Sequence, residues 1–210
     1  MIATEPVLSA TDNVFINCPF DAAYKPLFEA LIFTISACQF RARSALEIDD
    51  GSQTRLEKIY QIVAECRYGI HDLSRTELNA ETGLPRFNMP LELGIFLGAK
   101  RFGDDGQRHK RALLLDREAF RYQRFISDLA GADIQTHDNH PETAIGVVRD
   151  WLANVSRRRL PGTGILLRLH HEFRADLPAI ATRLGLVPEA IPFVDFEHIL
   201  LEWLARATNV

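Results

Sequence analysis

Short apolar runs alternate with segments of helical spacing, and this alternation constrains the fold more than any other feature of the sequence. The runs that we interpret as strands are Asn13–Asn17, Ala42–Ile48, Tyr68–Asp72, Arg111–Leu115 and Asp133–Thr136. Strands joined through helices pair in parallel, because each connection has to cross the sheet before the chain re-enters it. The sequence therefore predicts an α/β fold, a doubly wound and mostly parallel five-stranded sheet with helices on both faces.

Between these strands, apolar residues recur at helical spacing with charged residues on the opposite side. The helices that this spacing predicts are Tyr24–Cys38, Thr54–Cys66, Phe120–Leu129 and Glu142–Val155, together with one that begins near Met89.

Three consecutive arginines, Arg157 to Arg159, precede Pro161-Gly162 and mark an expected boundary. We therefore predict an α/β domain over residues 1–156 and a small helical C-terminal extension over residues 157–210. The helices expected in the extension are Ile165–Arg174, Pro178–Leu184 and Phe196–Ala207, the last with Asp195 as its N-cap. A tail of this length is too short for a large core of its own, so it should pack on the sheet domain or on a partner.

The charge, the cysteine spacing and the lengths of the apolar runs argue against several classes of function. The formal net charge of −4 over 210 residues argues against binding along a nucleic-acid backbone. Cys18, Cys38 and Cys66 are odd in number and far apart, which fits neither a zinc site nor a disulfide framework. No apolar run is long enough to cross a bilayer, and the N-terminus lacks the basic and apolar regions of a signal peptide. We expect a cytoplasmic protein without a metal or a bound cofactor.

Polar residues directly follow several of the expected strands. In doubly wound sheets, ligands bind outside the carboxyl ends of the strands, near the point where the strand order reverses. The residues on this rim that we take as candidate site residues are Asn17, Phe20, Asp21, Asp49, Asp72 and Ser74. Carboxylates in strand-end loops, including Asp50, more often form turns. His71 lies within a strand, where a structural role in the core is the better interpretation.

The helix that begins near Met89 holds the most unusual residue of the sequence, Glu92, in an otherwise apolar run. Gly94 and Gly98 share one helix face, which predicts a close approach of another group to the helix backbone. Glu92 has two interpretations. It is either a functional carboxylate that the helix dipole keeps ionised, or the N3 residue of a capping box with Met89 as the N-cap. Spacing by itself favours the capping box.

Two motifs occur in succession: Asp72-Leu73-Ser74 at a strand end, then Asn88-Met89-Pro90-Leu91-Glu92-Leu93-Gly94 at a helix start. This combination resembles nucleoside 2-deoxyribosyltransferase-like proteins and bacterial TIR-like domains, over roughly Val14–Leu115. It is also similar to a bacterial subgroup with His-Asp-Leu-Ser-Arg and Phe-Asn-Met-Pro-x-Glu-Leu-Gly. The resemblance implies a flavodoxin- or TIR-like sheet and a ligand that is a nucleoside, a nucleotide or NAD.

The resemblance also implies roles for single residues. Glu92 would be the nucleophile or the stabilising carboxylate at ribosyl C1, and Asp72 would hold the ribose or orient the base. Asn88, one turn before Glu92, would hydrogen-bond the same sugar. Independently of the resemblance, Arg75 and Arg86 flank the loop between the two motifs. They are either ligands of a phosphate or plain surface arginines, and the sequence favours neither. The second Asp and the Gly-Thr of the transferase pattern are absent, which leaves hydrolysis or simple binding open.

Two function classes follow from this resemblance. The first is an N-glycosidase acting on a nucleotide or nucleoside, with NAD among its substrates and a bacterial defence or toxin role. The second is a non-catalytic nucleotide-sensing module with the same pocket, because proteins of one fold differ in activity. In either class, the C-terminal helices would mediate formation of a homo-oligomer or contact with a partner protein.

Overall fold

The computed structural model describes residues 12–78 and 83–207, so the outermost parts of both predicted domains, 1–11 and 208–210, lie outside the described residues. Five strands form a sheet in the order β2-β1-β3-β4-β5. The strands are β1 (Asn13–Asn17), β2 (Arg41–Arg43), β3 (Tyr68–Asp72), β4 (Arg111–Asp116) and β5 (Ile134–Thr136). Every pairing is parallel, which confirms the predicted doubly wound α/β class. The chain runs from β1 outward to β2 and returns to β3 on the other side of β1, so the strand order reverses between β1 and β3.

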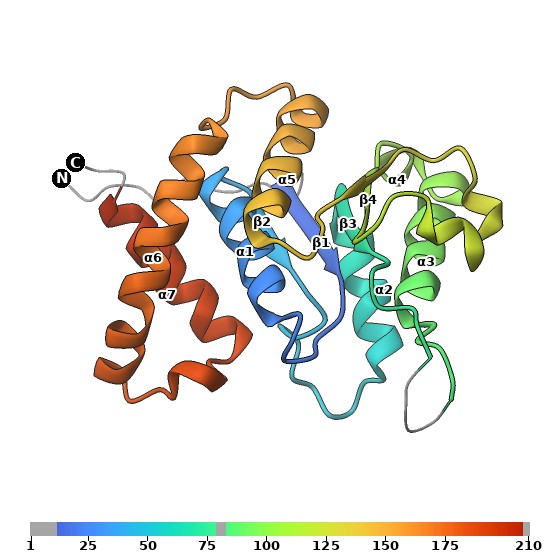
Figure 1. Cartoon of the computed structure of the whole chain (residues 1–210). Helices are drawn as coiled ribbons and strands as arrows, with labels where there is room; N and C mark the ends of the chain where they lie inside the picture. Colours follow the sequence, from blue (N-terminus) through green and yellow to red (C-terminus); the bar gives the residue numbers. More distant parts are fainter. Residues whose placement is uncertain (1–11, 79–82, 208–210) are drawn as a thin grey trace.

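Helices cover both faces of the sheet (Figure 1). Those connecting the strands are α1 (Lys25–Ala37), α2 (Arg55–Glu65), α3 (Asn88–Phe102), the short α4 (Asp105–Arg108) and α5 (Pro141–Ser156). Successive strand residues point to opposite faces. Val14 and Ile16 of β1 therefore pack in the cluster formed with α1 and α5, whereas Phe15 between them packs in the cluster formed with α2 and α3.

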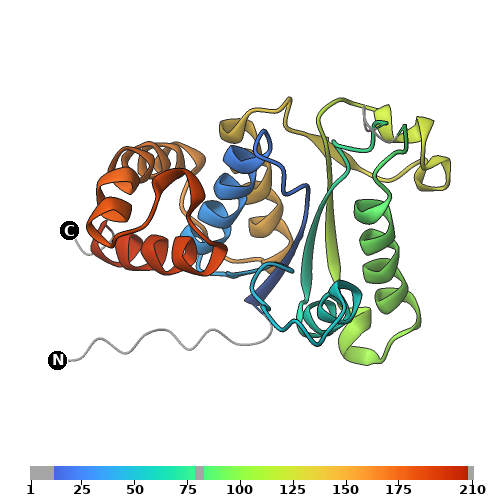
Figure 2. The same ribbon diagram turned by 90° about the horizontal axis from the view of Figure 1, so that it is seen from below.

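The C-terminal helices α6 (Thr163–Arg183) and α7 (Phe193–Ala207), joined through the 3-10 turn η4 (Pro188–Ala190), form a further layer beside α1 (Figures 1 and 2). Their apolar residues belong to the same core cluster as those of α1, α5 and the sheet. Because α1 is covered by the sheet on one side and by this layer on the other, every residue from Leu27 to Ser36 is buried. The tail therefore packs on the sheet domain, one of the two arrangements expected from its length.

Two details of the tail differ from the prediction. Pro178 lies inside α6 and does not begin a separate helix. Its neighbours Leu177 and Ala181 are buried, and their packing offsets the roughly 3 kcal/mol that a proline costs in a helix interior. α7 begins at Phe193, so Asp195 lies in its first turn and is not the N-cap. Within the described ranges, no helix has the length and apolar character needed to span a membrane.

β2 ends at Arg43, well before the predicted Ile48. The guanidinium of Arg43 lies 2.5 Å from the carboxylate of Glu47 and 2.9 Å from that of Glu65. Glu47 also accepts a hydrogen bond from the backbone N–H of Ser44 at 3.2 Å. These contacts turn the chain away from the sheet directly after Arg43.

The segment predicted as one helix, Phe120–Leu129, instead forms two 3-10 turns, η2 (Arg121–Arg124) and η3 (Ser127–Leu129). Phe120 adopts a left-handed conformation with φ 61°, which an α-helix does not accommodate. Arg121 is buried and donates from Nε to Asp116 at 2.8 Å and from its terminal nitrogen to the carbonyl of Leu73. The contacts of Arg121 therefore hold this segment against the ends of β3 and β4. The helical spacing of the sequence does not reveal these contacts.

The glycines of α3 do not serve the predicted close approach. A Cβ built at Gly94 or Gly98 would meet no atom of the described residues within 4 Å. The close approach occurs at Gly69 in β3, where a Cβ would lie 2.7 Å from Nε2 of His71 and 2.8 Å from the ring of Phe96. The ring of Phe96 thus packs from α3 directly onto the backbone of the strand.

Candidate functional site

A cleft of about 510 Å³ opens beside the carboxyl end of β1, near the reversal of the strand order. Its walls come from the loop after β1, the start of α2, the segment before α3 and the first turns of α3. Of the residues predicted from the sequence, those that line the cleft are Phe20, Asp21, Arg86, Asn88 and Glu92. The volume falls within the roughly 300–1,000 Å³ of typical small-molecule sites.

Glu92 lies in the second turn of α3, four residues after Asn88, which begins the helix. The N-cap is Phe87 and no side chain caps the helix, so the capping-box interpretation is wrong. Pro90 lies in the first turn as expected, where its missing N–H breaks no bond within the helix. Glu92 has 4% of its surface exposed and lines the cleft, which leaves the functional interpretation standing.

Burial raises the pKa of Glu92 to about 7, although the guanidinium of Arg55 lowers it from a distance of 3.8 Å. The expected ionisation by the helix dipole is therefore not the dominant effect, because the dipole fades beyond the first turn. A carboxyl group with this pKa gains and loses its proton near neutral pH, which is the property required of groups in acid–base and nucleophilic chemistry.

Asp21 links the loops at the mouth of the cleft. Its carboxylate accepts from the backbone N–H of Tyr24 at 3.0 Å, lies 3.1 Å from Arg86 and lies 3.9 Å from Arg75. Such partly exposed ion pairs add little stability, but they hold two guanidinium groups beside the opening. Since the partner of these arginines among the described residues is a partly exposed carboxylate, an anionic ligand can compete for them.

Asn17 anchors α3 and does not line the cleft. It is 1% exposed, and its side-chain amide donates to the carbonyl of Met89 at 2.8 Å and lies 3.1 Å from Nδ1 of His71. Burial lowers the pKa of His71 to about 3, so this ring is neutral and acts in the core, as interpreted from the sequence. The contacts of Asn17 tie the start of α3 to β1 and β3, and thereby fix Glu92 relative to the sheet.

Asp72 is fully buried at the end of β3 and does not line the cleft. It accepts hydrogen bonds from the hydroxyl of Tyr24 and from the backbone N–H of Ser74, and Nε2 of His137 lies 2.8 Å from it. Burial by itself would raise the pKa of Asp72, but His137, Ser74 and Tyr24 together hold it below its usual value. Its partners are therefore protein groups, and the sugar contact expected for Asp72 is not available from the cleft.

Asp49 and Ser74 also lie apart from the cleft. Asp49 is exposed in the loop after β2, and its neighbour Asp50 forms a turn by accepting from the N–H and the hydroxyl of Ser52, at 2.9 and 2.7 Å. The hydroxyl of Ser74 is buried without a hydrogen-bond partner among the described residues.

Arg55, Tyr24 and His137 have roles that the sequence does not single out. Arg55 is the first residue of α2 and has the pattern of a solvated surface residue, yet it lines the cleft beside Glu92. His137 directly follows β5, so the rule that strand ends form one rim applies to it as well. Tyr24, the N-cap of α1, reads in the sequence only as an apolar helix residue.

The cleft therefore combines one carboxyl group that titrates near neutral pH with arginine side chains and two aromatic rings, Phe20 and Phe87. Cys18 also lines it, but burial raises the pKa of this thiol well above its usual value, so the thiol is protonated and a poor nucleophile. Such a site can bind a planar, anionic ligand and place a carboxylate against it.

In comparisons with known proteins, no family model, no curated protein and no solved structure matches the chain.

Proposed function

We propose that this chain is an N-glycosidase that hydrolyses the bond between ribosyl C1 and the base of a nucleotide or nucleoside, with NAD as the first substrate to test. The proposal depends on one observation: the carboxyl group of Glu92 lines a cleft of ligand size, and burial raises its pKa to about 7. The resemblance around Asn88 and Glu92 supports the choice of a ribosyl substrate.

In the proposed reaction, the C1–N bond breaks and its electron pair leaves with the base. Ionised Glu92 stabilises the positive charge that develops on C1 or attacks it, and water then supplies the oxygen that bonds to C1. The proton released by water passes to the base or to solvent. Asn88 contacts a sugar hydroxyl, Arg55 and Arg86 bind a phosphate, and Phe20 or Phe87 stacks on the base.

The test is to incubate the purified chain with NAD, mononucleotides and nucleosides and to measure release of the free base by chromatography. Glu92→Gln should abolish release, whereas Glu118→Gln, which changes an exposed carboxylate outside the cleft, should not. Release that persists in Glu92→Gln would remove the basis of this proposal.

Binding without turnover is the second candidate function, and one observation favours it. Asp21, the other carboxylate that lines the cleft, is paired with Arg86 and Arg75, and Asp72 is buried with protein partners outside the cleft. In the described part of the chain, the cleft therefore has no second carboxyl group that is free of an ion pair to assist Glu92. Saturable nucleotide binding that is weakened by Arg86→Gln, with no product from any substrate, would identify a nucleotide sensor.

The proposal includes a cytoplasmic setting in bacterial defence and assembly through the C-terminal helices. Exposed apolar side chains on α6 and α7, among them Ile165, Val194 and Leu201, are consistent with a surface that associates with another copy. Light scattering of the purified chain, compared with Leu201→Glu, measures this directly. A monomer at all concentrations would contradict the assembly.

A further inference from the structure

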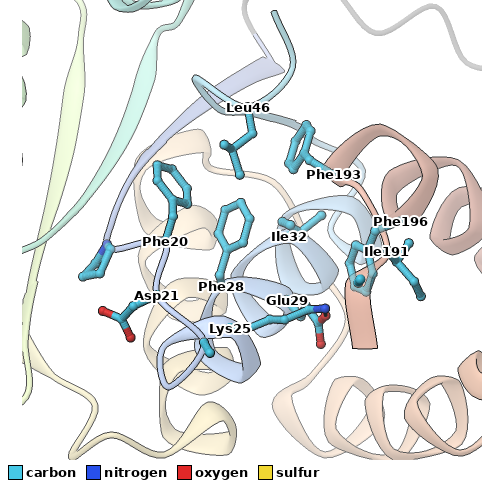
Figure 3. A pocket seen from close by; sticks show the side chains of 13 residues that line it. Phe20, Asp21, Lys25, Phe28, Glu29, Ile32, Leu46, Ile191, Phe193 and Phe196 are labelled. Atoms are coloured by element: carbon cyan, nitrogen blue, oxygen red, sulfur yellow. Dashed lines mark ion pairs between the residues drawn. The ribbon is translucent and has the colours of Figure 1, made fainter. Parts of the chain in front are cut away.

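A second hollow, of about 250 Å³, lies on the other side of the loop after β1 from the Glu92 cleft. It is formed by that loop, the first half of α1 and the start of α7, and Figure 3 shows Leu46 and the phenylalanine rings gathered around it. The aromatic rings in its wall are Phe20, Phe28, Phe193 and Phe196. The hollow exists only because the C-terminal helices lie beside α1, and nothing in the proposed function uses it.

The wall of this hollow has the geometry of an aromatic slot. The rings of Phe20 and Phe28 meet edge to face with centroids 5.3 Å apart, and those of Phe28 and Phe193 stack at 5.9 Å with 24° between their planes. Edge-to-face and offset-stacked contacts are the arrangements that a further aromatic ring can extend. An apolar cavity of about 150 Å³ already holds one benzene ring, so a hollow of this size accepts one or two fused rings but no polypeptide segment.

The charges at the rim are paired within the protein. Nζ of Lys25 lies 3.7 Å from the carboxylate of Glu29 (Figure 3). The same Nζ donates to the carbonyl of Glu189 at 2.6 Å, and Glu29 also pairs with Arg174. Asp21 is held by Arg86 and Arg75 on the side of the cleft. A charged ligand would have to displace these partners, so an uncharged ligand fits the hollow better.

We propose that this hollow is a binding site for a small, uncharged, planar aromatic molecule, and that its occupancy is transmitted to the Glu92 cleft through Phe20. Phe20 belongs to the walls of both cavities. The guanidinium of Arg55 lies 5.2 Å from the centre of the Phe20 ring, and the same guanidinium lies 3.8 Å from Glu92. A ring bound against Phe20 therefore shifts the Phe20 side chain and, with it, the guanidinium of Arg55 that packs on this ring.

Indole is the probe, and saturation-transfer NMR on the full chain measures its binding. Saturable binding is expected in wild type, and Ala22→Trp, which places a large ring at an exposed lining position, should weaken it by about tenfold or more. The neighbouring Ala23→Trp is the matched control, because Ala23 is exposed but does not line the hollow. Ala190→Trp fills the opposite wall and gives a second test if the first variant is poorly folded.

The second measurement follows the Nε–H resonance of Arg55, assigned with Arg55→Lys, during the indole titration. It should shift with the same saturation curve as binding in wild type and in Ala23→Trp, and stay fixed in Ala22→Trp. The proposed binding site would be refuted if indole showed no saturable binding, or if neither Ala22→Trp nor Ala190→Trp weakened that binding. Binding that leaves the Arg55 resonance unmoved would overturn the link to the cleft. None of these outcomes depends on whether the chain cleaves a nucleotide.

Discussion

The carboxylate of Glu92 and the guanidinium of Arg55 lie 3.8 Å apart in the cleft, so the effect of Arg55 on the pKa of Glu92 can be tested by mutation. Because the charge of Arg55 lowers the pKa of Glu92, which burial raises to about 7, Arg55→Gln should move this pKa further upward. If ionised Glu92 is the active form, kcat/KM for base release should rise with pH around this value, and the rise should move to higher pH in the variant. Lys58→Gln on the same helix should leave the profile unchanged. A carboxyl ¹³C titration of Glu92 gives the same answer without turnover.

The raised pKa of Glu92 also makes the free energy of unfolding depend on pH. The folded value of about 7 lies above the unfolded value of about 4.3, so the protonated carboxyl favours the folded state. This contribution is complete below pH 4.3 and is lost as the pH rises through 7. Relative to Glu92→Gln, wild type should lose roughly 2–4 kcal/mol between about pH 4 and pH 8, measured by urea unfolding. Parallel pH profiles of the two proteins would refute the shift.

The buried hydroxyl of Tyr24 donates to ionised Asp72, so Tyr24→Phe leaves a buried carboxylate short of one partner. The variant should lose about 1.5–3 kcal/mol of unfolding free energy at pH 7. Because the pKa of Asp72 is lowered on folding, its stabilising contribution exists above the unfolded pKa and disappears as the pH falls through the folded one. The deficit of Tyr24→Phe should therefore shrink in acid. Tyr60→Phe, at an exposed tyrosine, is the control and should cost little.

At the scale of elements, the glycines of α3 lie in open surroundings, whereas the glycine of β3 lies in crowded ones. Gly94 and Gly98 have open space at the position of a Cβ, so Gly94→Ala and Gly98→Ala should each raise the unfolding free energy by about 0.5–1 kcal/mol through helix propensity. Gly69→Ala should instead lower it by about 1–3 kcal/mol, because the methyl group overlaps Phe96 and His71. Chemical unfolding of the three variants gives both signs in one experiment. A destabilising Gly94→Ala would contradict the open space described at this position.

For the whole molecule, the continuous core predicts that the tail and the sheet unfold together. Phe173 of α6 is fully buried and contacts rings of α1 and α7, including Phe33 and Trp203. Phe173→Ala should cost about 3–5 kcal/mol, whereas Phe102→Ala, at a residue 86% exposed, should cost little. Fluorescence of Trp203 in α7 and of Trp151 in α5 should report a single transition in urea. Separate transitions would show that the tail is an independent unit.

Much of the fold follows from the sequence because its signals are local. β1 and β3 have the predicted bounds, since a short apolar run ended by polar or proline residues specifies both the strand and its limits. α2 begins at Arg55, one residue after the predicted start at Thr54, which is the N-cap and forms a capping box with Glu57. Two of the wrong predictions, the end of β2 and the helix over Phe120–Leu129, concern segments whose course depends on distant partners, namely Arg43 with Glu65 and Arg121 with the end of β3.

The sequence by itself determined the succession of strands and helices along the chain, the parallel pairing of the strands and the rim beside which the cleft opens. It could do so because periodicity and turn residues act over a few neighbouring positions. Only the tertiary structure decided which rim residues line a cleft. Asp72 and Glu92 are both carboxylates in the two motifs on which the resemblance rests. Asp72 is nevertheless buried in contact with Tyr24 and His137, whereas Glu92 lines a cleft beside Arg55. Burial and charge pairing arise from residues far apart in the chain, so the pKa of about 7 for Glu92 exists only once these residues are in contact.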